Sequence, residues 1–414
     1  MSTAPFVPQM LIVADDLTGA ADTGGVFASA GIATSIGFPN EAIPRNSVVA
    51  LFTDSRMLDS AAAGQLTTLA LAGVAHSSRP EPRWIYKKID STLRGNPAAE
   101  LFAVMDAMHE HTALVAPALP AEGRTTRDGH QYVDGIRLDR LPDAESGAQS
   151  SIRSMFQARP ETPVHLLPFE VVRAGDAAVV RYMSSTGPGI IVADAENDVD
   201  LLTLSRAAAS RDVRILCGSA GFARALSVVL PFTRDEFTTA TNGHADVPVL
   251  VVAGSRQLAT VAQVEQLELA GCRIIRPEPA TLTDDASSIS AVVASVASAL
   301  KSGQSTVLTT THLPPMSAHA SRIANRLAEI ATDPGVCEHV GGLVLTGGDI
   351  ATAVLRKLHV RAIHLRGEIR PAMPWGMIAS ALPTGIPVAT KAGGFGDAGA
   401  LLACIEHFCG KLSV

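Results

Sequence analysis

Residues 10–25 read MLIVADDLTGAADTGG, an apolar run that stops at two adjacent carboxylates before a turn and a helix of small residues. The run before Asp15 predicts a buried parallel strand, because such strands are apolar on both faces. Ligands bind just beyond the carboxyl ends of such strands, so we expect a binding site at Asp15 and Asp16. Thr18 is a candidate N-cap, and Asp22 lies one turn later on the same helix face. The acidic cluster suits a hydroxyl-bearing or cationic ligand, or a metal, better than a bare phosphate, and its alternative role is helix capping by Asp16 and Thr18.

Size and composition indicate a globular protein with more than one core. The chain has 414 residues, of which 47% are hydrophobic, so we expect two domains, or three. No apolar run approaches the roughly 18 residues of a membrane span, and the first ten residues do not resemble a signal peptide. We therefore expect a soluble, cytoplasmic protein that binds no membrane.

Charge and cysteine usage narrow the class of partner. The net charge is -7 and no block of Lys and Arg occurs, which argues against nucleic acid and favours a small molecule. The five cysteines are scattered without a C-x-x-C pair, so neither a disulfide framework nor structural zinc is expected. His109 and His111 fit surface positions better than a metal site, and no metal-ligating residue is predicted. The sequence gives no oligomeric state, and a homodimer is kept as an assembly to test.

Strand-like and helix-like runs alternate along the chain, which predicts an α/β fold with two doubly wound domains and mainly parallel sheets. The polar stretch 233–246 has no helical or strand period and is followed by an apolar run. We therefore predict an N-terminal domain over 1–235, a linker over 236–246 and a C-terminal domain over 247–414. The predicted strands are 10–14, 47–53, 83–89, 112–116, 189–193, 213–217, 247–253, 273–276, 305–310, 342–345 and 387–390.

Three glycine-bearing turns in the C-terminal half each follow a predicted strand and precede a helix, at 253–255, 346–349 and 391–397. Glycine lets backbone approach an anion closely, and the N–H groups of the next helix supply donors. Any one of these glycines is adequately explained by turn geometry. Turns at the carboxyl edge of one sheet gather in one crevice, however, so the three together predict a site for a phosphate-rich ligand. Neither G-x-x-x-x-G-K-[ST] nor G-x-G-x-x-G is present.

Basic and acidic side chains follow strands of the N-terminal half. Arg56 suits bidentate binding of a carboxylate or phosphate, or else a surface ion pair with Asp54 or Asp59. Residues 87–96 read KKIDSTLRGN, and strand alternation sends Lys88 and Asp90 to one face and Lys87 to the other. Arg124, after a turn with two prolines, is a second candidate for binding an anion. The N-terminal half thus offers basic and acidic side chains for a polyol-like substrate, and the C-terminal half offers backbone donors for phosphate. Phosphoryl transfer with Mg²⁺ needs these groups to position the substrates, to neutralise charge and to accept a proton.

The motifs IVADDLTGAADTG, TDSR, KKIDSTLRGN, PALPAEGRTTRDGHQYVDG, CGSAGFA, VVAGSRQLATVAQV, VLTGGDIATAVL and KAGGFGD together resemble the four-carbon acid sugar kinase family, in order over nearly the whole chain. The resemblance implies a sugar-acid-binding domain, a nucleotide-binding domain and an active site in the cleft between them. The candidate substrate-binding residues are Asp15, Arg56, Lys87, Lys88, Ile89, Asp90, Arg94 and Arg124. The candidate ATP-binding residues are Ser255, Gly347, Gly348, Asp349, Ile350, Lys391, Gly393 and Gly394.

The same resemblance implies transfer of phosphate from ATP, with Mg²⁺, to the C4 hydroxyl of a four-carbon sugar acid, giving the 4-phosphate and ADP. ADDLTGAADTG is closer to the D-threonate and D-erythronate kinases, in that order of expectation, than to the 3-oxo-tetronate kinases, which tend to have Phe at position 17. The candidate catalytic residues are Asp16 and, by analogy with the Gly-Asp base of other sugar kinases, Asp397. The turn AGSRQLAT departs from the usual Ser-Gly-Ser-Cys-Ser-like turn, so no side-chain role after Ser255 is implied.

Three alternatives remain open at this point. One is a 3-oxo-tetronate 4-kinase. The second is an NAD-dependent hydroxy-acid dehydrogenase, which shares the doubly wound layers but would need the missing G-x-G-x-x-G motif. The third is a sugar-acid sensor without catalytic activity.

Overall fold

The protein is described from a computed structural model, which covers residues 7–39, 41–77, 81–141, 149–234, 247–284, 288–314, 319–380 and 385–409. The chain divides into two compact units, Met1–Asp235 and Glu236–Val414, and each is described by itself. The linker predicted at 236–246 lies outside the described residues. Within the described ranges, no helix combines the length and the apolar character that a membrane span requires.

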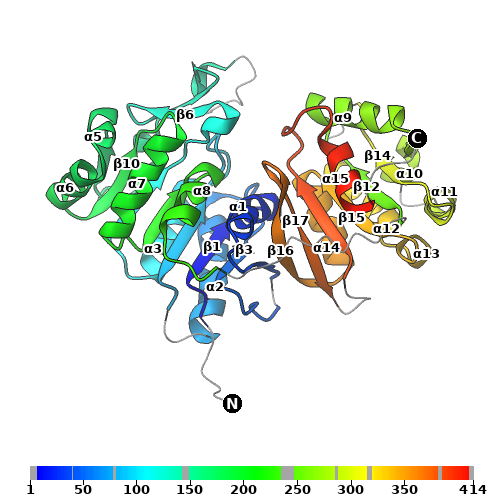
Figure 1. Ribbon diagram of the computed structural model, residues 1–414, viewed down its shortest axis with the longest axis horizontal. Helices are drawn as coiled ribbons and strands as arrows, with labels where there is room; N and C mark the ends of the chain where they lie inside the picture. Colours follow the sequence, from blue (N-terminus) through cyan, green and yellow to red (C-terminus); the bar gives the residue numbers. More distant parts are fainter. Residues whose placement is uncertain are drawn as a thin grey trace. The chain divides into compact units, whose positions relative to one another are not determined.

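The N-terminal unit is built on a parallel sheet of order β2-β3-β1-β4-β11-β5-β10-β9 (Figure 1). Its strands are β1 (Met10–Ala14), β2 (Thr34–Gly37), β3 (Val48–Phe52), β4 (Trp84–Lys88), β5 (Thr112–Ala116), β9 (Val164–Leu167), β10 (Gly189–Ala193) and β11 (Ile215–Gly218). A small antiparallel sheet follows β5 and contains β6 (Arg124–Arg127), β7 (His130–Val133) and β8 (Ile136–Arg137). The apolar run that opens the motif at 10–25 is the central strand β1, buried along its whole length.

Helices cover both faces of this sheet. They are α1 (Leu17–Ser29), α2 (Ser60–Ser77), α3 (Pro97–Ala107), α4 (Ile152–Phe156), α5 (Phe169–Arg173), α6 (Asp176–Thr186), α7 (Asp198–Ser210) and α8 (Ala220–Val229), with the 3-10 turns η1 (Pro120–Glu122) and η2 (Leu138–Arg140). Side chains of α2 and α3 pack with Ile85 in one core, whereas Tyr86 packs against Phe222 of α8 on the other face. Because side chains alternate along a strand, these contacts fix which way each residue of β4 points.

The C-terminal unit has a mixed sheet of order β13-β14-β12-β15-β18-β17-β16, parallel from β13 to β18. Its strands are β12 (Val249–Ala253), β13 (Arg273–Ile275), β14 (Thr306–Thr309), β15 (Gly342–Thr346), β16 (Val360–Arg370), β17 (Met373–Ser380) and β18 (Pro387–Lys391). Its helices are α9 (Leu258–Leu269), α10 (Pro279–Thr283), α11 (Ser290–Lys301), α12 (Ala320–Ala331), α13 (Pro334–Cys337), α14 (Gly348–Lys357) and α15 (Ala400–Cys409). Residues of α9 and α15 share a core with alternate residues of β12, and α12 packs against α14.

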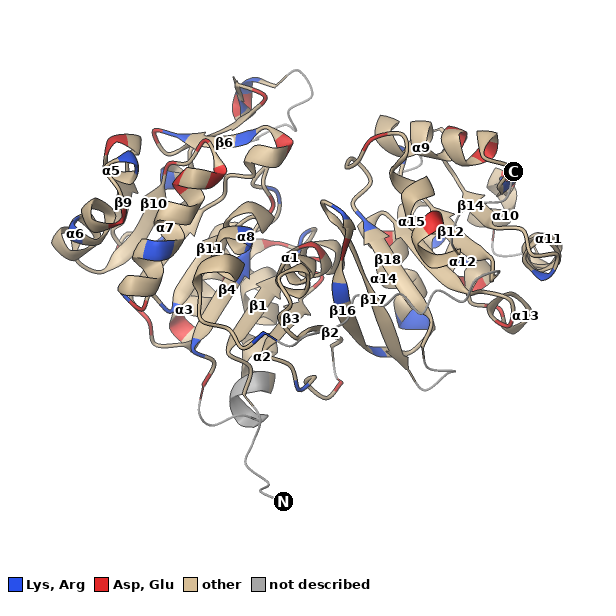
Figure 2. Ribbon diagram, viewed as in Figure 1, with Lys and Arg blue, Asp and Glu red and all other residues tan. Residues whose placement is uncertain are grey.

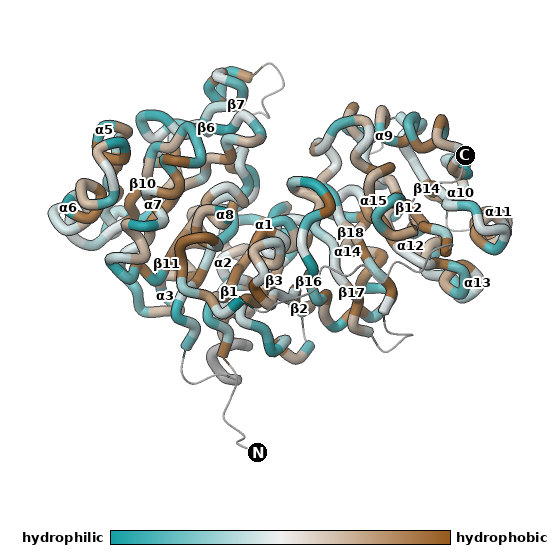
Figure 3. The backbone as a smooth tube through the Cα atoms, viewed as in Figure 1, coloured by the Kyte–Doolittle hydropathy of each residue, from teal (hydrophilic) through white to brown (hydrophobic). Residues whose placement is uncertain are grey.

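The predicted α/β class with mainly parallel sheets is confirmed. The strands β1, β12 and β15 carry no charged residue, and β1 and β12 are tan in Figure 2 and coloured towards brown in Figure 3. The antiparallel hairpin of β16 and β17 was not predicted. Its residues alternate between buried and exposed only in part, and bulges interrupt the pairing, so the two-residue period is weak in the sequence.

Candidate active site

The carboxylates that follow β1 have different partners. Asp16 is the N-cap of α1: its Oδ1 accepts a hydrogen bond from Gly19 N at 2.7 Å, and its Oδ2 accepts one from Thr18 Oγ1 at 2.6 Å. The prediction of Thr18 as the N-cap is therefore wrong, because Thr18 lies inside the helix and donates to the capping residue instead. A Cβ at Gly19 would lie 2.7 Å from Asp16 Oδ1, so glycine is needed for this close approach.

Arg56 is the cation around which the carboxylates gather. Its Nε and Nη2 donate to the two oxygens of Asp15 at 2.7 and 2.8 Å, and its Nη1 lies 2.7 Å from Asp16 Oδ2. Asp90 Oδ2 is 4.0 Å from Nη2. The bidentate geometry expected of Arg56 is thus used by Asp15, and neither Asp54 nor Asp59 takes it.

The charges of this cluster reinforce one another. Burial lowers the pKa of Arg56, but the hydrogen bond to Asp15 and the charges of Asp15, Asp16 and Asp90 outweigh it and raise that pKa above its ordinary value. Burial raises the pKa of Asp15, and the hydrogen bond and charge of Arg56, with the charges of Lys87 and Lys88, bring it below its ordinary value. Asp15 is therefore ionised and fixed in place rather than ready to take a proton.

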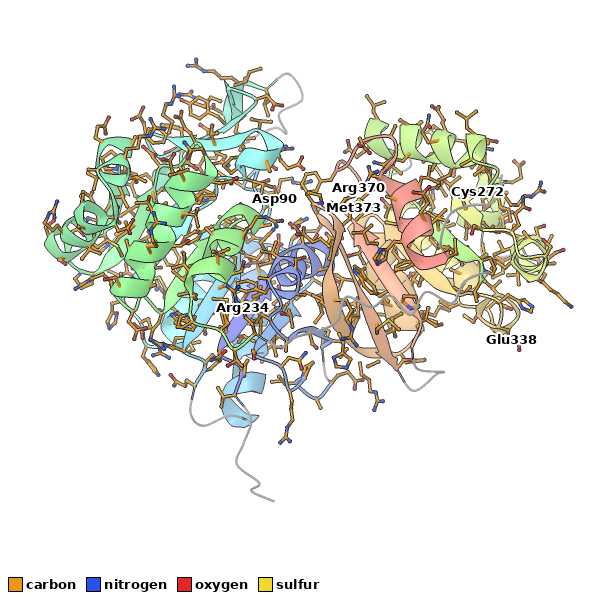
Figure 4. All side chains as sticks on the ribbon, in the orientation of Figure 1. Asp90, Arg234, Cys272, Glu338, Arg370 and Met373 are labelled. Atoms are coloured by element: carbon orange, nitrogen blue, oxygen red, sulfur yellow. The ribbon has the colours of Figure 1, made fainter. Side chains whose placement is uncertain are left out.

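The loop after β4 folds back onto Asp15. Asp90, labelled in Figure 4, accepts hydrogen bonds from Thr92 N at 2.8 Å and from Arg94 Nη2 at 2.6 Å. Burial raises the pKa of Asp90, and the bond and charge of Arg94, then Arg56 and Thr92, lower it overall. Gly95 has a φ of +83°, and a Cβ there would lie 2.9 Å from Asp15 Oδ2. The glycine is required both by the left-handed backbone and by the approach to Asp15.

Lys87 belongs to a buried network beneath the site. Its side chain is completely buried, and its Nζ lies 2.8 Å from Glu100 Oε2 of α3 and donates to Val13 O at 3.2 Å and Lys88 O at 2.8 Å. Glu100 Oε1 accepts a hydrogen bond from Ser55 Oγ at 2.5 Å. The Lys87 ammonium thus bonds to the ends of β1 and β4, and Glu100 extends the network to Ser55 after β3. This buried placement argues against direct contact between the Lys87 side chain and a substrate.

Lys88 points the other way, towards α1. A Cβ on Gly19 would lie 3.5 Å from Lys88 Nζ. The residue is only 6% exposed, and within the described part of the chain its ammonium makes no hydrogen bond and no ion pair shorter than 4 Å. Its charge helps to lower the pKa of Asp15. A nearly buried ammonium without a direct partner is costly unless an anion binds to it, which makes Lys88 the strongest ligand-binding candidate in this unit.

Two other candidates of the N-terminal unit are placed differently. Ile89 packs in the apolar core with α3 and donates its N–H to Gly218 O at 2.9 Å, so its side chain does not face the acidic cluster. Arg124, in β6, has its Nη1 3.5 Å from Glu122 Oε2 and also donates to the carbonyl oxygen of Glu122. The small sheet does reach the loop after β4 through Gln131, a fully buried side chain whose Nε2 donates to Ser91 O at 2.8 Å.

In the C-terminal unit, the turns after β12 and β15 line a pocket of about 560 Å³. Such a volume is ordinary for a small-molecule site, for which about 300–1,000 Å³ is typical. The chain leaves β12 for one face of the sheet, and leaves the flanking strands β14 and β15 for the other. The pocket therefore lies at a topological switch point, where doubly wound folds bind ligands. Its walls are Gly254, Ser255, Arg256, Gln257, Leu258, Thr310, Leu313, Pro314, Ala320, Ile323, Ala324, Gly347, Gly348, Asp349 and Ile350.

The third glycine turn abuts this pocket at Ser255. A Cβ at Gly393 would lie 2.0 Å from Ser255 Oγ, whereas one at Gly394 would meet nothing within 4 Å. Lys391, a candidate ATP-binding residue, holds this turn together: its nearly buried ammonium donates to Ala392 O, Gly393 O and Phe395 O at 2.8, 3.2 and 2.9 Å. Burial lowers the pKa of Lys391 to about 8.

A buried amide completes the anchoring of this turn. Gln263 Nε2 donates to Phe395 O, Gly396 O and Asp397 O at 3.0, 3.1 and 2.9 Å. With these carbonyl groups turned inward, the described structure records no backbone acceptor for the N–H groups of Gly393 and Gly394. A turn anchored through its oxygens leaves donors for an anion.

The two candidate carboxylates of this unit, Asp349 and Asp397, differ in their position relative to the pocket. Asp397 is 72% exposed and pairs with Arg370 at 2.7 Å, outside the pocket walls; Figure 4 labels Arg370 near the tip of the β16–β17 hairpin. Asp349 lines the pocket in the first turn of α14 and is exposed, with no hydrogen bond or ion pair to any described residue. The geometry thus favours Asp349 over Asp397 as the acidic group near a bound phosphate.

Sequence reasoning missed Glu100, Gln131 and Gln263, the side chains that fix the loops of both sites. Each lies inside a helix or strand, where a polar residue looks like part of a solvated face. A sequence signal existed only for Gln263, which interrupts the apolar stripe of α9 between Val261 and Val264.

The two units thus define a two-domain protein with a cluster of acidic and basic side chains at the carboxyl edge of one sheet and a glycine-lined pocket at the carboxyl edge of the other. Residues 10–226 match the sugar-binding N-terminal domain family, and residues 250–401 match the nucleotide-binding C-terminal domain family. The chain belongs to the four-carbon acid sugar kinase family.

Named relatives span almost the whole chain. A D-threonate kinase of Salmonella typhimurium is 33% identical over 97% of this chain and 100% of its own length. A D-threonate kinase of Bordetella bronchiseptica is 34% identical, over 96% and 97% respectively. A D-erythronate kinase and several 3-oxo-tetronate kinases also match. A crystal structure from Salmonella typhimurium LT2, 20% identical, shares the fold with a TM-score of 0.78 over 96% of this chain and 99% of that one.

Proposed function

We propose that the protein phosphorylates the C4 hydroxyl of D-threonate with ATP, giving D-threonate 4-phosphate and ADP. The observation that carries the proposal is Lys88, a nearly buried ammonium without a direct partner among the described residues, beside the acidic cluster at the end of β1. A sugar acid supplies the carboxylate that Lys88 lacks and the hydroxyl groups that carboxylates hold well. Named relatives with this activity support the choice of substrate.

In this proposal the residues around Arg56 have different roles in binding the sugar acid. Lys88 binds the carboxylate of the substrate, and Asp16 and Asp90 accept hydrogen bonds from its hydroxyls. Asp15 and Arg56 hold each other rigidly, which keeps Asp16 and Asp90 in place. Such preorganisation lowers the cost of binding a flexible polyol.

Transfer forms a bond from the C4 oxygen to the γ-phosphorus of ATP and breaks the bond from that phosphorus to the β,γ-bridging oxygen. The bridging oxygen leaves with its electron pair on ADP, and the hydroxyl proton passes to the Asp16 carboxylate. Because phosphoryl transfer has a loose transition state, positioning and charge neutralisation matter more than a strong base. Asp16 is the most exposed carboxylate of the cluster, at 14%, against 3% for Asp15 and 11% for Asp90.

The C-terminal pocket would hold the nucleotide. The turns at Ser255 and Gly347–Gly348, with the helices that follow them, offer N–H donors to phosphate, and Leu313, Pro314 and Ile323 offer an apolar wall to the base. Asp349 fits Mg²⁺, which commonly binds through one or two carboxylates plus phosphate oxygens. Bound there, the metal would neutralise phosphate charge. The reaction requires that the acceptor hydroxyl and the γ-phosphate meet, and the predicted cleft between the domains stays a prediction.

Because the chain belongs to the kinase family, we no longer consider a dehydrogenase or a sensor. D-Erythronate and a 3-oxo-tetronate remain alternative substrates, because relatives named as kinases of these acids also match the chain. Incubation with ATP, Mg²⁺ and D-threonate, L-threonate, D-erythronate or a 3-oxo-tetronate, followed by ADP release and ³¹P NMR of the product, tests the proposal. We expect the highest kcat/KM with D-threonate and a phosphomonoester on C4. Absence of turnover with all four acids would overturn it. A homodimer and a cytoplasmic location also stay predictions.

A further inference from the structure

The nucleotide pocket of the C-terminal unit has two charged residues in its described walls, Arg256 and Asp349. Arg256 stands in the turn between β12 and α9, directly after Ser255, and is exposed. It has no hydrogen bond or ion pair with any described residue. The other cations nearby are engaged: Lys391 donates to three carbonyl oxygens, and Arg370 is paired with Asp397.

We propose that Arg256 binds the γ-phosphate of ATP and stabilises the charge of the transition state, an inference that rests on the proposed kinase function. Arg256 would then act as the arginine finger of some phosphotransferases does, from the β12–α9 turn of the same chain.

The chemistry of the pocket favours this role over an ordinary surface arginine. The described walls fall into an apolar part, with Leu313, Pro314 and Ile323, and a glycine-rich part around Gly347 and Gly348. The base of a nucleotide fits the first part and its phosphates fit the second. A polyanionic phosphate chain needs positive charge, and backbone donors with Mg²⁺ leave part of it uncompensated. Arg256 directly follows Ser255, whose Cβ lies 3.8 Å from where a Cβ on Gly347 would stand, so its turn borders the glycine-rich part.

Arginine suits the γ-phosphate for a geometric reason. Its guanidinium presents paired donors that match two phosphate oxygens, and it holds its proton at any working pH. During transfer, charge builds up on the bridging oxygen while the C4 oxygen approaches the phosphorus. A cation bound to the γ-phosphate oxygens and reaching the bridging oxygen lowers the barrier at this step.

Calorimetric titration of the full chain, with Mg²⁺, tests the inference without the sugar acid. The ligands are AMP, ADP and an ATP analogue with a non-hydrolysable β,γ-bridge, and the variants are Arg256→Ala, Arg256→Lys and the surface control Arg276→Ala. We expect Arg256→Ala to weaken binding of the ATP analogue by at least about tenfold, to weaken binding of ADP less, and to leave binding of AMP unchanged. Arg276→Ala should bind all three ligands as the parent does. Arg256→Lys restores part of the binding, because it keeps the charge but loses the paired donors.

Turnover then separates this inference from the proposed function. With D-threonate, we expect Arg256→Ala to lower kcat on the order of 10³-fold, with an unchanged KM for the acid. Equal loss of AMP and analogue binding, or no loss of either, would overturn the role of Arg256. If the parent binds the analogue with the expected Arg256 dependence but phosphorylates no tetronate, the proposed function fails and the phosphate contact stands.

Discussion

Lys87 and Glu100 form an ion pair of 2.8 Å in which the two side chains are 0% and 2% exposed. The pair lies on the α2–α3 face of the N-terminal sheet, and Lys87 Nζ also donates to the carbonyls of Val13 and Lys88. Ser55 donates to the other oxygen of Glu100. Glu100 and Lys87 therefore link the strand ends that precede Asp15 and Arg56 to the end of β4, which carries Lys88.

Glu100→Gln is expected to destabilise the N-terminal unit by about 3–5 kcal/mol, because it leaves the Lys87 charge buried without its counter-ion. Urea unfolding followed by circular dichroism measures the loss. Glu81→Gln is the matched control: Glu81 is 53% exposed in its pair with Arg214, so its loss should stay below about 1 kcal/mol. Lys87→Met combined with Glu100→Leu should recover most of the stability. Equal effects of Glu100→Gln and Glu81→Gln would show that the buried pair is not important.

Lys88→Met should lower kcat/KM for D-threonate by about 10²-fold or more, because a charge-assisted bond to the substrate carboxylate is lost in a nearly buried site. The loss should fall mainly on KM for the acid, with KM for ATP unchanged. The polyol D-threitol, which has no carboxylate, provides a second comparison: the parent should discriminate strongly against it, and Lys88→Met much less. Lys301→Met, at the exposed end of α11, is the control. Undiminished discrimination in Lys88→Met would place the carboxylate elsewhere.

The sequence predicted where the sites lie better than how their side chains are used. Strand ends and glycine turns depend on local pattern, so β1, the central strands and the turn at 346–349 were found at nearly their observed bounds. Alternation along β4 correctly separated Lys87 from Lys88, and the contacts of Tyr86 and Ile85 show the same two faces. The two lysines were nevertheless both taken as substrate residues.

The sequence does not show which partner each charged group meets in the folded chain, whether that partner is distant in sequence or belongs to the same turn. Arg56 is held by Asp15, 41 positions away, and Lys87 by Glu100 of the following helix. Lys391 resembles a phosphate ligand in sequence, but carbonyls of its own turn surround its ammonium. Neither periodicity nor composition carries this information.

Asp194 gives the N-terminal unit a pH-dependent contact. Its two oxygens accept hydrogen bonds from Gly129 N and Asp128 N, both at 2.9 Å, at the turn between β6 and β7. Burial raises its pKa to about 6, although these bonds oppose the shift. An unfolded aspartate titrates near pH 3.9, so between about pH 4 and 6 the folded protein holds a proton that the unfolded chain has lost. The contribution of Asp194 to stability therefore falls as pH rises through this window.

Asp194→Asn removes that titration and isolates its effect. The free energy of unfolding of the parent minus that of Asp194→Asn should fall between about pH 4 and 6 and level off above it. Urea unfolding at intervals across this range measures the difference. A flat difference would mean that Asp194 ionises at its ordinary pKa in the folded protein, and a difference that rises with pH would mean that folding lowers that pKa.

Gly393 and Gly394 provide a matched pair for the nucleotide site. An alanine Cβ at Gly393 would meet Ser255 Oγ at 2.0 Å and Ser255 Cβ at 2.6 Å, so the turns after β12 and β18 must separate, whereas one at Gly394 has open space around it. Because phosphate donors act over fractions of an ångström, we expect Gly393→Ala to raise KM for ATP by about 10–10²-fold and Gly394→Ala to leave it nearly unchanged. The KM for D-threonate should not change in either variant, since the N-terminal unit is untouched.

Ser255→Gly added to Gly393→Ala removes the obstructing side chain and should recover nucleotide binding in part. Steady-state kinetics of the four proteins measures these effects, and equal behaviour of the two alanine variants would show that the contact between Gly393 and Ser255 does not shape the site.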